Sequence, residues 1–172
     1  LKQESSSLTQ SNVTGTLNLL RFAEESDVSR FIYCGSCFEY GQGDALAEKD
    51  FPKPTSEYGI SKLTGWLLAD MFTRQFQVPV VSIRPFMVYG PFEAPFRLVP
   101  YVILNDVQGK ELKLTGGKQT RDFVYIDDVV EGILTALTEP KAIGETFNLA
   151  SGQAVSIKEA VKKILKVLGN PV

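Results

Sequence analysis

The chain has 172 residues, of which 44% are apolar and 22% charged, and its net charge is −2. This composition is typical of a globular protein with a sizeable core. The absence of a basic run argues against a nucleic-acid or membrane-surface protein, and the apolar runs are too short to span a membrane. No signal peptide is visible in residues 1–20. Because the chain contains no histidine, Ser-His nucleophile systems and His-based metal sites are excluded, and we predict no metal.

The first part of the chain alternates helical and strand-like segments. Leu1–Gln10 is polar and Ser-rich and is predicted to be poorly ordered. Ser11 is the expected cap of a helix over Asn12–Glu25, which carries apolar residues at helical spacing. Phe31–Cys34 is a continuous apolar run that predicts a buried parallel strand. Several Gly and Pro residues then break regular structure over Gly41–Pro54.

A central helix follows this loop. Thr55 or Ser56 is expected to cap it, and its apolar pattern continues to about Phe76. The next segment, Val78–Phe86, is rich in Val and Ile and predicts another strand. The order helix, strand, helix, strand indicates a parallel α/β sheet with right-handed crossovers. No internal repeat is visible.

The remaining chain consists of short elements separated by turns. Ser156 and Glu159 form a capping box, and Gly169 followed by Pro171 ends the helix that this box starts. The other expected elements are a helix over Val99–Gln108 that ends at Gly109, short strands at Glu111–Thr115, Phe123–Ile126 and Thr146–Leu149, and a helix capped by Asp127 that runs through Leu137.

Tyr58 and Lys62 stand four residues apart at the start of the central helix. This spacing puts both side chains on one helix face, about 6 Å apart along the axis. A free tyrosine has a pKa of about 10, and a cation within about 4–6 Å lowers that pKa. Such a pair can act as a general acid/base on an alcohol or a ketone. An exposed helix face with a half-buried tyrosine has the same spacing, so the flanking sequence has to decide.

Cys34 and Cys37 form a C-x-x-C motif. The spacing suits a redox dithiol or half of a zinc site, but a zinc ion would lack ligands because there is no second pair and no histidine. A redox dithiol normally opens a helix, whereas Gly41, Gly43 and a polar loop follow here. We therefore expect two reduced thiols at a strand end in a cytoplasmic protein.

Several short motifs run through the chain beside the Tyr58 helix. They are Asn12–Leu17, Arg30–Tyr33 followed by Ser36 and Tyr40-Gly41, Tyr58–Lys62, Arg84–Pro91, Thr120–Val129 and Phe147–Leu149. In this order and at these spacings they resemble the extended short-chain dehydrogenase/reductase family of NAD-dependent sugar-nucleotide epimerases, dehydratases and ketoreductases. The resemblance implies a partial Rossmann-type parallel sheet with a small C-terminal α/β substrate lobe. Residues 1–91 would form the C-terminal half of the Rossmann-type domain, and residues 92–172 mainly the substrate-binding lobe.

The resemblance also implies roles for individual residues. Tyr58 matches the catalytic acid/base, and Lys62 matches its cation, which also holds the nicotinamide ribose. Ser36 matches the catalytic Ser/Thr whose hydroxyl bonds the reacting sugar oxygen. The cofactor would be NAD or NADP, with Asn12 and Phe86 near it beside Tyr58 and Lys62. An Asn at a helix start is also a common cap, and Phe86 would equally suit a core.

The implied substrate is a nucleotide sugar. Arg121 resembles the arginine that binds the nucleotide diphosphate, a role that suits the guanidinium fork. Arg97, Leu98 and Val99 match a segment that meets the substrate through its backbone. Met87 stands where R-x-F-N-x-Y-G-P commonly has Asn, and it cannot make the same hydrogen bond to the substrate.

Two departures from the family bear on activity. The sequence has no G-x-x-G-x-x-G, the motif that opens the family's chains and holds the cofactor pyrophosphate; Gly41 and Gly43 come closest. We therefore expect this chain alone to bind the cofactor weakly or not at all. The dehydratase branch carries acidic residues just after the catalytic Thr, where this chain has Cys37 and Phe38. That difference favours epimerisation or keto reduction over dehydration.

The sequence thus predicts an NAD(P)-dependent epimerase or ketoreductase that acts on a nucleotide sugar by hydride transfer, with Tyr58 as the acid/base. The alternatives are a catalytically inactive remnant that serves as a binding or dimerisation module, and a C-x-x-C redox protein. In the family the helices that match Asn12–Glu25 and Glu57–Phe76 pair across a two-fold axis, so we expect a homodimer.

Overall fold

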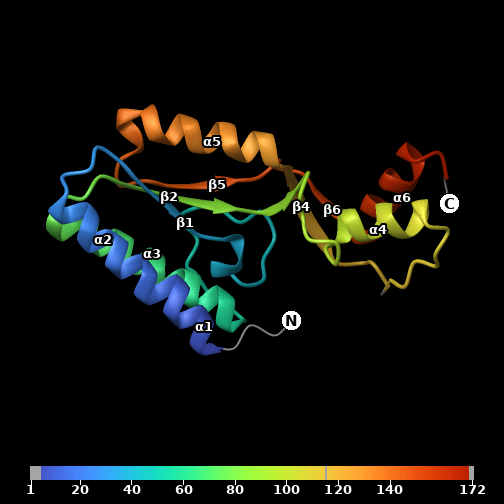
Figure 1. Ribbon diagram of the computed structural model, residues 1–172, viewed down its shortest axis with the longest axis horizontal. Coiled ribbons are helices and arrows are strands. Elements are labelled where there is room, and N and C mark those ends of the chain that lie inside the picture. The colour runs from blue at the N-terminus through green and yellow to red at the C-terminus, as the bar shows by residue number, and fades with distance from the viewer. Residues whose placement is uncertain (1–4, 115, 171–172) are drawn as a thin grey trace. The chain divides into compact units, whose positions relative to one another are not determined.

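The computed structural model of the protein describes residues 5–114 and 116–170. These residues form two compact units (Figure 1). Unit 1 comprises the described part of Leu1–Phe86 together with Val129–Leu149, and unit 2 comprises Met87–Asp128 and Ala150–Val172 as far as they are described. The units divide after Phe86, whereas the sequence suggested a division after residue 91. The segment 129–149 belongs to unit 1 because its strand joins the sheet of that unit.

Unit 1 is built on a parallel sheet. Its strands are β1 (Phe31–Cys34), β2 (Val80–Pro85) and β5 (Thr146–Leu149), in the order β1-β2-β5. The central strand β2 is buried along nearly all of its length, which explains its unbroken apolar sequence. The predicted parallel α/β sheet is confirmed.

Helices cover both faces of this sheet. In Figure 1, α2 (Gly15–Glu25) and α3 (Glu57–Phe76) lie on one face and α5 (Ile126–Thr138) lies on the other. Neighbouring residues of a strand point to opposite faces, so Tyr33 packs with α2 and α3 while Ile32 packs with α5.

The N-terminal helix starts earlier than predicted. A short helix, α1 (Ser5–Thr9), continues through the π-helical turn η1 (Gln10–Thr14) directly into α2. The expected cap at Ser11 is wrong, because this residue lies inside the helical run. The expected disorder of Leu1–Gln10 is wrong for residues 5–10, since α1 contacts α3 and its Leu8 is buried; residues 1–4 lie outside the described residues.

The helix α3 agrees with its prediction. Ser56 is the cap, and its hydroxyl accepts a hydrogen bond of 3.1 Å from the amide of Gly59. Gln77 ends the helix in the left-handed conformation. The predicted loop over Gly41–Pro54 holds no helix or strand. The strand predicted at Val78–Phe86 is confirmed over β2.

Unit 2 has its own small sheet and helices. The strands are β3 (Met87–Tyr89), β4 (Thr120–Tyr125) and β6 (Ala154–Ser156), with β3 parallel and β6 antiparallel to β4. The helices α4 (Leu98–Val107) and α6 (Ile157–Val167) pack around Val102, Val161 and Leu165. The capping box of Ser156 and Glu159 starts α6 as predicted.

Three details of unit 2 and its border differ from the sequence prediction. Residues 111–114 form no strand, because Leu112 packs on the α4–α6 cluster and the Lys113 amide donates to the Tyr101 hydroxyl instead of to a strand; Thr115 lies outside the described residues. Asp127 does not cap α5, which already begins at Ile126. The Asp127 carboxylate lies in the first turn, where it interacts favourably with the helix dipole. The strand β6 was not predicted.

Short 3₁₀ helices complete the fold. They are η2 (Cys37–Glu39) and η3 (Pro140–Ala142). In the part of the chain that the structure describes, no helix combines the length and the apolar character needed to cross a membrane.

Candidate active site

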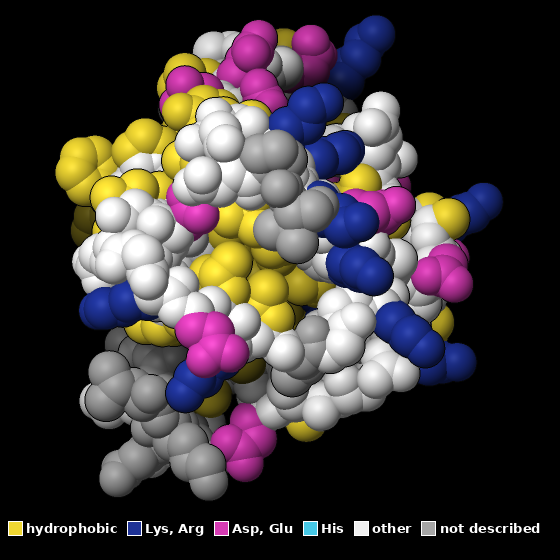
Figure 2. Space-filling view, turned by 90° about the vertical axis from the view of Figure 1, so that its right-hand side faces the viewer, with side chains coloured by type: hydrophobic (Ala, Val, Ile, Leu, Met, Phe, Trp, Pro, Cys, Tyr) yellow, Lys and Arg dark blue, Asp and Glu magenta, His cyan; other side chains and the backbone are white. Residues whose placement is uncertain are grey.

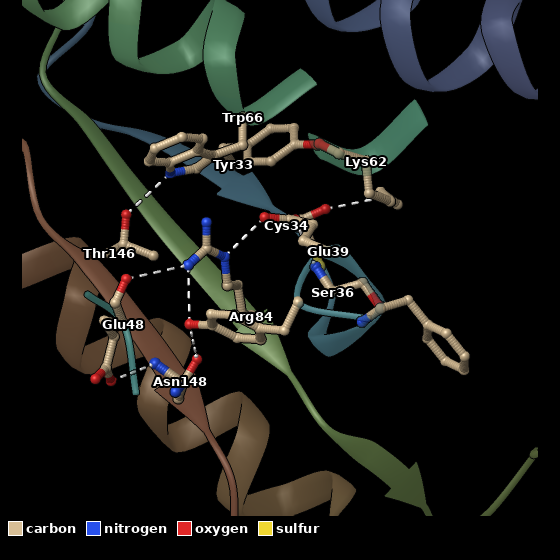
Figure 3. Close-up of polar contacts among 12 residues, drawn as sticks. Tyr33, Cys34, Ser36, Glu39, Glu48, Lys62, Trp66, Arg84, Thr146 and Asn148 are labelled. Carbon is tan, nitrogen blue, oxygen red and sulfur yellow. Dashed lines mark hydrogen bonds and ion pairs between the residues drawn. The ribbon is translucent and has the colours of Figure 1, made fainter. Parts of the chain in front are cut away.

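Three predicted catalytic residues lie together in unit 1. The Lys62 ammonium on α3 donates a hydrogen bond of 2.9 Å to the carbonyl oxygen of Cys34, at the end of β1 (Figure 3). The same nitrogen lies 5.9 Å from the ring centroid of Tyr58. Ser36, two residues beyond Cys34, lies near enough to Tyr58 for its side chain to lower the pKa of that phenol. The turn after β1 and the first turns of α3 therefore assemble the Ser-Tyr-Lys set.

The ionisation of Tyr58 differs from the sequence expectation. Burial raises the pKa of its phenol above the ordinary value, and the hydrogen bond with Ser36 only partly lowers it. Negative charge on Cys34 or on Glu39 would raise this pKa further. The lowering that a nearby cation can cause is not the net result here, because desolvation of the phenol is the largest effect and raises its pKa.

Ser36 is held tightly by its own turn. It caps η2, and its hydroxyl accepts a hydrogen bond of 3.2 Å from the amide of Phe38. Its amide donates a hydrogen bond of 2.9 Å to the carboxylate of Glu39. These reciprocal bonds form a capping box. Ser36 is also buried, so these bonds fix its position at the end of β1.

Asn12 lies beside this site but is not a helix cap. It belongs to the π-helical turn η1, and its side-chain amide donates a hydrogen bond of 3.0 Å to the hydroxyl of Ser61. Ser61 in turn donates to the carbonyl oxygen of Tyr58 at 2.8 Å. Single π turns occur often at functional sites. Here the turn brings Asn12 against the part of α3 that carries Tyr58 and Lys62.

Phe86 follows the end of β2. Its amide donates a hydrogen bond of 2.9 Å to the carbonyl oxygen of Leu149, at the end of β5. Because β1 and β2 are parallel, Phe86 and Ser36 follow the same edge of the sheet. Ligands of open α/β sheets bind outside the carboxyl ends of the strands, so both residues stand where a ligand is expected.

Unit 2 gathers most of the predicted substrate residues. Met87, Arg97, Leu98 and Val99 line one pocket of about 240 Å³. Arg97 lies 3.5 Å from the carboxylate of Glu93 at the pocket wall. Four of the six residues predicted to bind the substrate therefore share one cavity within this unit.

Arg121 is not among the residues that line this pocket. It is exposed, and its guanidinium donates a hydrogen bond of 2.7 Å to the carbonyl oxygen of Thr120. On the face of the molecule drawn in Figure 2, apolar side chains gather in a hollow, and Lys and Arg side chains lie beside it. Asp and Glu side chains also border the hollow, so that face carries charges of both signs around apolar surface.

Sequence reasoning missed the charged pair that supports Ser36. The side chains of Arg84 and Glu39 are 1% and 0% exposed, and they form an ion pair of 2.7 Å (Figure 3). Two local signals were present in the sequence: an arginine within the apolar strand β2, and a glutamate three residues after Ser36 as in a capping box. Neither signal reveals that the two charges meet.

The C-x-x-C motif contains two reduced thiols, Cys34 and Cys37. Burial raises the pKa of the Cys34 thiol, and the charge of Lys62 lowers it only in part. A raised pKa disfavours the reactive thiolate that a redox dithiol requires. Among the described residues, no group of three or more His, Cys, Asp and Glu side chains could hold a metal ion.

Comparison of the sequence with known proteins identifies close relatives. A model of the NAD-dependent epimerase/dehydratase family matches residues 2–150. The chain is 34% identical over 160 residues to the uncharacterized UDP-glucose epimerase YtcB of Bacillus subtilis, a match that covers 92% of the chain and 51% of the relative. It is 33% identical over 160 residues to the human dTDP-D-glucose 4,6-dehydratase, with 91% of the chain and 45% of the relative covered.

Solved structures give the same result. The UDP-glucuronic acid 4-epimerase of Bacillus cereus, in complex with UDP-glucuronic acid and NAD, matches with a TM-score of 0.88 and 33% identity over 94% of the chain and 52% of that structure. DesIV, the dTDP-glucose 4,6-dehydratase of Streptomyces venezuelae, matches with a TM-score of 0.89 and 30% identity over 96% of the chain and 52% of that structure.

The chain spans about half the length of the relatives that it matches. Over that half, both the sequence and the fold agree with epimerases and dehydratases of sugar nucleotides. The resemblance predicted from the motifs is confirmed. The chain belongs to the NAD-dependent epimerase/dehydratase family.

Proposed function

We propose that the chain carries the proton-transfer residues of an NAD(P)-dependent epimerase or ketoreductase that acts on a nucleotide sugar. The observation that carries this proposal is the meeting of Ser36, Tyr58 and Lys62 after the end of β1. Ser36 would bind the reacting sugar oxygen, and Tyr58 would exchange a proton with it. Lys62 would hold both the end of β1 and the cofactor ribose.

The site suits the nicotinamide end of the cofactor. The Lys62 ammonium and the partly exposed Tyr58 phenol are two hydrogen-bond donors that lie close together. They could bind neighbouring hydroxyls of the ribose. When bound, the cofactor supplies the centre that takes a hydride from the sugar carbon and returns it. The sequence has no glycine-rich motif for the pyrophosphate, so the residues of this chain fit one end of the cofactor only.

The raised pKa of Tyr58 indicates how the residue works. In the protein alone the phenol is protonated at neutral pH, so it is ready to donate a proton when a ketone is reduced. The reverse reaction needs the phenolate, which positive charge near the ring favours. Lys62 is a candidate for that charge, since its ammonium lies 5.9 Å from the Tyr58 ring centroid.

We favour epimerisation or keto reduction over dehydration. The position that is acidic in the dehydratase branch holds Phe38, which has no carboxylate. Its ring packs edge-on against Tyr58, with centroids 5.9 Å apart and planes at 80°. The next acidic residue, Glu39, is fully buried and paired with Arg84. Neither side chain can serve as a second acid or base on the sugar.

Unit 2 carries its own candidate residues for substrate binding. The pocket of Met87, Arg97, Leu98 and Val99 offers apolar walls and one guanidinium, which suit part of a nucleotide sugar. Arg121, exposed on β4, would bind the diphosphate by charge-assisted hydrogen bonds.

A second candidate function is a dimerisation or binding module without turnover. It is supported by Leu19 and Phe22 on α2 and by Ile60 and Leu67 on α3, each of which is more than half exposed. Two adjacent helices with outward-facing apolar side chains suit a two-fold interface. A homodimer is compatible with both candidate functions.

The proposal is tested by calorimetry with NAD and NADP and by a sugar-nucleotide epimerase assay. Both measurements are made on this chain and on a fusion with the nucleotide-binding half of a family member. We expect weak or no cofactor binding and no turnover for the chain alone, because positioning contributes about 7–11 kcal/mol to a well-oriented reaction.

In the fusion, Tyr58→Phe should abolish turnover, while Tyr101→Phe serves as the matched control because its hydroxyl bonds to the backbone of Lys113 in unit 2. Micromolar cofactor affinity of the chain alone would contradict the expected dependence on a glycine-rich half. Turnover that persists in the Tyr58→Phe fusion would refute the assignment of the acid/base.

A further inference from the structure

The ion pair of Arg84 and Glu39 lies in an unusual place for charge. Both side chains are almost completely buried, and the Arg84 Nε atom lies 2.7 Å from the Glu39 carboxylate. Burying two charges costs several kcal/mol per ion, and their attraction often fails to offset this cost. The Nη2 atom of Arg84 is also buried without an acceptor among the residues that the structure describes. Stability alone is therefore a poor explanation for this pair.

Glu39 connects the ion pair directly to Ser36. One carboxylate oxygen accepts the Ser36 amide at 2.9 Å, and the other accepts Arg84 Nε at 2.7 Å. Gly35 leaves room for this arrangement, because a side chain at that position would collide with the Glu39 carboxylate. The backbone at Gly35 and Ser36 thus leaves space for the Glu39 carboxylate and gives it a hydrogen-bond donor.

Arg84 is itself anchored to the sheet and to two rings. Its Nη1 atom donates to the hydroxyl of Tyr40 at 2.8 Å, and Tyr40 donates to the Asn148 side chain at 2.8 Å (Figure 3). Arg84 and Asn148 stand opposite each other on β2 and β5. The guanidinium carbon lies 4.6 Å from the Tyr40 ring centroid and 4.9 Å from that of Trp66. The two neighbouring strands therefore fix the position of the guanidinium.

A second capping box in the same chain shows that local capping needs no such support. Ser156 and Glu159 make the same reciprocal bonds at the start of α6, with the Ser156 amide 3.0 Å from the Glu159 carboxylate. Glu159 is exposed to solvent, whereas Glu39 is fully buried. Arg84 consequently adds something to Ser36 beyond helix capping: a fixed position relative to the sheet.

We propose that Glu39, Arg84 and Tyr40 are positioning residues that hold Ser36 in place beside Tyr58. The chain of contacts runs from β5 through Tyr40, Arg84 and Glu39 to the amide of Ser36. The catalytic use of this contact rests on the proposed function, whereas the positioning of Ser36 does not. None of the three side chains needs to touch the substrate.

The first test compares Glu39→Gln with Glu159→Gln by amide hydrogen exchange. Glutamine keeps an acceptor for the serine amide but removes the charge that holds Arg84. Without the ion pair to Arg84, the side chain at position 39 is held less firmly, and its bond to the Ser36 amide weakens. We expect exchange of that amide to accelerate about tenfold in Glu39→Gln, an effect as large as the loss of roughly one hydrogen bond. Exchange of the Ser36 amide should stay at the wild-type rate in Glu159→Gln. Equal Ser36 exchange in wild type and Glu39→Gln would overturn the proposal.

The second test uses Arg84→Lys, which keeps the positive charge and loses the guanidinium fork. The Ser36 side chain lowers the pKa of the Tyr58 phenol. Displacement of Ser36 should weaken this effect. We therefore expect the pKa of Tyr58, followed by NMR of labelled tyrosine, to rise in Arg84→Lys. Arg74→Lys is the matched control, because Arg74 forms an exposed pair with Asp70 on the far part of α3. An unchanged Tyr58 pKa in Arg84→Lys would count against positioning.

A double replacement covers the case in which single variants unfold. Glu39→Met with Arg84→Met removes both charges, and buried pairs can often be replaced by apolar residues without loss of stability. We expect a folded protein whose Ser36 amide exchanges faster than in the wild type. A folded double variant with wild-type exchange at Ser36 would refute the proposal.

These readouts need no cofactor and no turnover. Their failure would remove the positioning role and leave the proposed function standing. Failure of the fusion assay, with the exchange and pKa results as expected, would remove the proposed function and leave the positioning of Ser36 established.

Discussion

Lys62 joins two elements of the site through a single side chain. Its ammonium donates to the Cys34 carbonyl, and the carbonyl of its own backbone accepts a hydrogen bond of 2.6 Å from the Tyr33 hydroxyl. Both partners belong to β1, so side chain and backbone bind the same strand to the start of α3. Tyr58, one turn earlier, is thereby held over the end of the sheet. The proposed acid/base group is thus placed by neighbours to which no role in proton transfer is assigned.

Removal of the Ser36 hydroxyl, with no other change, should shift the pKa of Tyr58. The hydrogen bond from the Ser36 side chain lowers this pKa against the larger effect of burial. Removing the hydroxyl in Ser36→Ala should therefore raise the Tyr58 pKa further above its ordinary value of 10.0. NMR titration of labelled tyrosine measures the shift, and Ser156→Ala at the other capping box is the control. A Tyr58 pKa that falls in Ser36→Ala would show that the contact does not stabilise the phenolate.

Tyr33 should make the fold sensitive to alkali. Burial raises the pKa of its phenol far above the ordinary value of 10.0. Since the folded protein retains a proton that the unfolded chain releases, the contribution of Tyr33 is fully present below pH 10.0 and is lost as the pH rises beyond it. The free energy of unfolding should thus fall more steeply above this pH in the wild type than in Tyr33→Phe.

Urea unfolding at a series of pH values measures this slope. Tyr33→Phe should also lower the free energy of unfolding by about 1–3 kcal/mol at neutral pH, because the Lys62 carbonyl loses its buried donor. Tyr101→Phe in unit 2 should keep the wild-type pH slope. Identical slopes for wild type and Tyr33→Phe would mean that Tyr33 ionises in the folded state as it does in the unfolded chain.

At the scale of elements, the sequence predicts best what local signals mark. The helix α3 carries a serine cap and a long apolar pattern, and its observed bounds agree with the prediction. The helix α1 was missed because its sequence, SSSLT, is polar apart from Leu8, and only packing against α3 makes it helical. The strand β6 has three residues, too few for a periodic pattern, and is defined by its pairing with β4.

In the candidate site, too, the residues marked by local motifs were predicted, and the features that depend on the fold were missed. Tyr58, Lys62 and Ser36 were found from short motifs that each carry their own spacing. The ion pair of Glu39 and Arg84 was missed because its members stand 45 positions apart in the sequence, and only the fold joins them. The raised pKa of Tyr58 was missed for a related reason, since desolvation depends on neighbours from several elements.

Gly65 should be indispensable for the packing of α3 on the N-terminal helix. A Cβ at this position would collide with the Tyr33 hydroxyl and lie 2.9 Å from the carbonyl oxygen of Asn12. Gly65→Ala should therefore destabilise the fold by about 1–3 kcal/mol through overpacking. Gly15→Ala is the matched control: its Cβ would lie 3.5 Å from the nearest atom, so it should stabilise the helix by about 0.5–1 kcal/mol.

Urea denaturation of the two variants tests both signs together. The same variants should also differ at the active site, because Asn12 bonds to Ser61 on the adjacent turn of α3. NMR signals of Ser61 should shift in Gly65→Ala and stay in place in Gly15→Ala. If Gly65→Ala were as stable as the wild type, the two helices would have to separate without cost, contrary to the close approach seen here.

At the scale of the whole molecule, the two units carry different parts of one proposed reaction. Unit 1 holds the Ser-Tyr-Lys set on a rigid parallel sheet, and unit 2 holds a pocket lined by Met87, Arg97, Leu98 and Val99. The chain spans about half the length of its relatives, and it contains no glycine-rich pyrophosphate motif. We therefore propose that this chain contributes proton transfer and substrate contacts, and we expect it to bind the cofactor weakly on its own.

The outward faces of α2 and α3 should make the protein a dimer. Leu19 and Phe22 on α2 and Ile60 and Leu67 on α3 are each more than half exposed, and the two helices pack side by side. A two-fold axis would place each of these side chains against the same face of a second copy. Phe22→Lys with Leu67→Lys brings like charges together across that axis, which costs several kcal/mol, so the variant should be monomeric. Val167→Lys, on exposed α6 surface, should leave the mass unchanged. Sedimentation equilibrium over a range of concentrations measures all three proteins, and a wild type that stays monomeric throughout would leave these apolar faces without the proposed role.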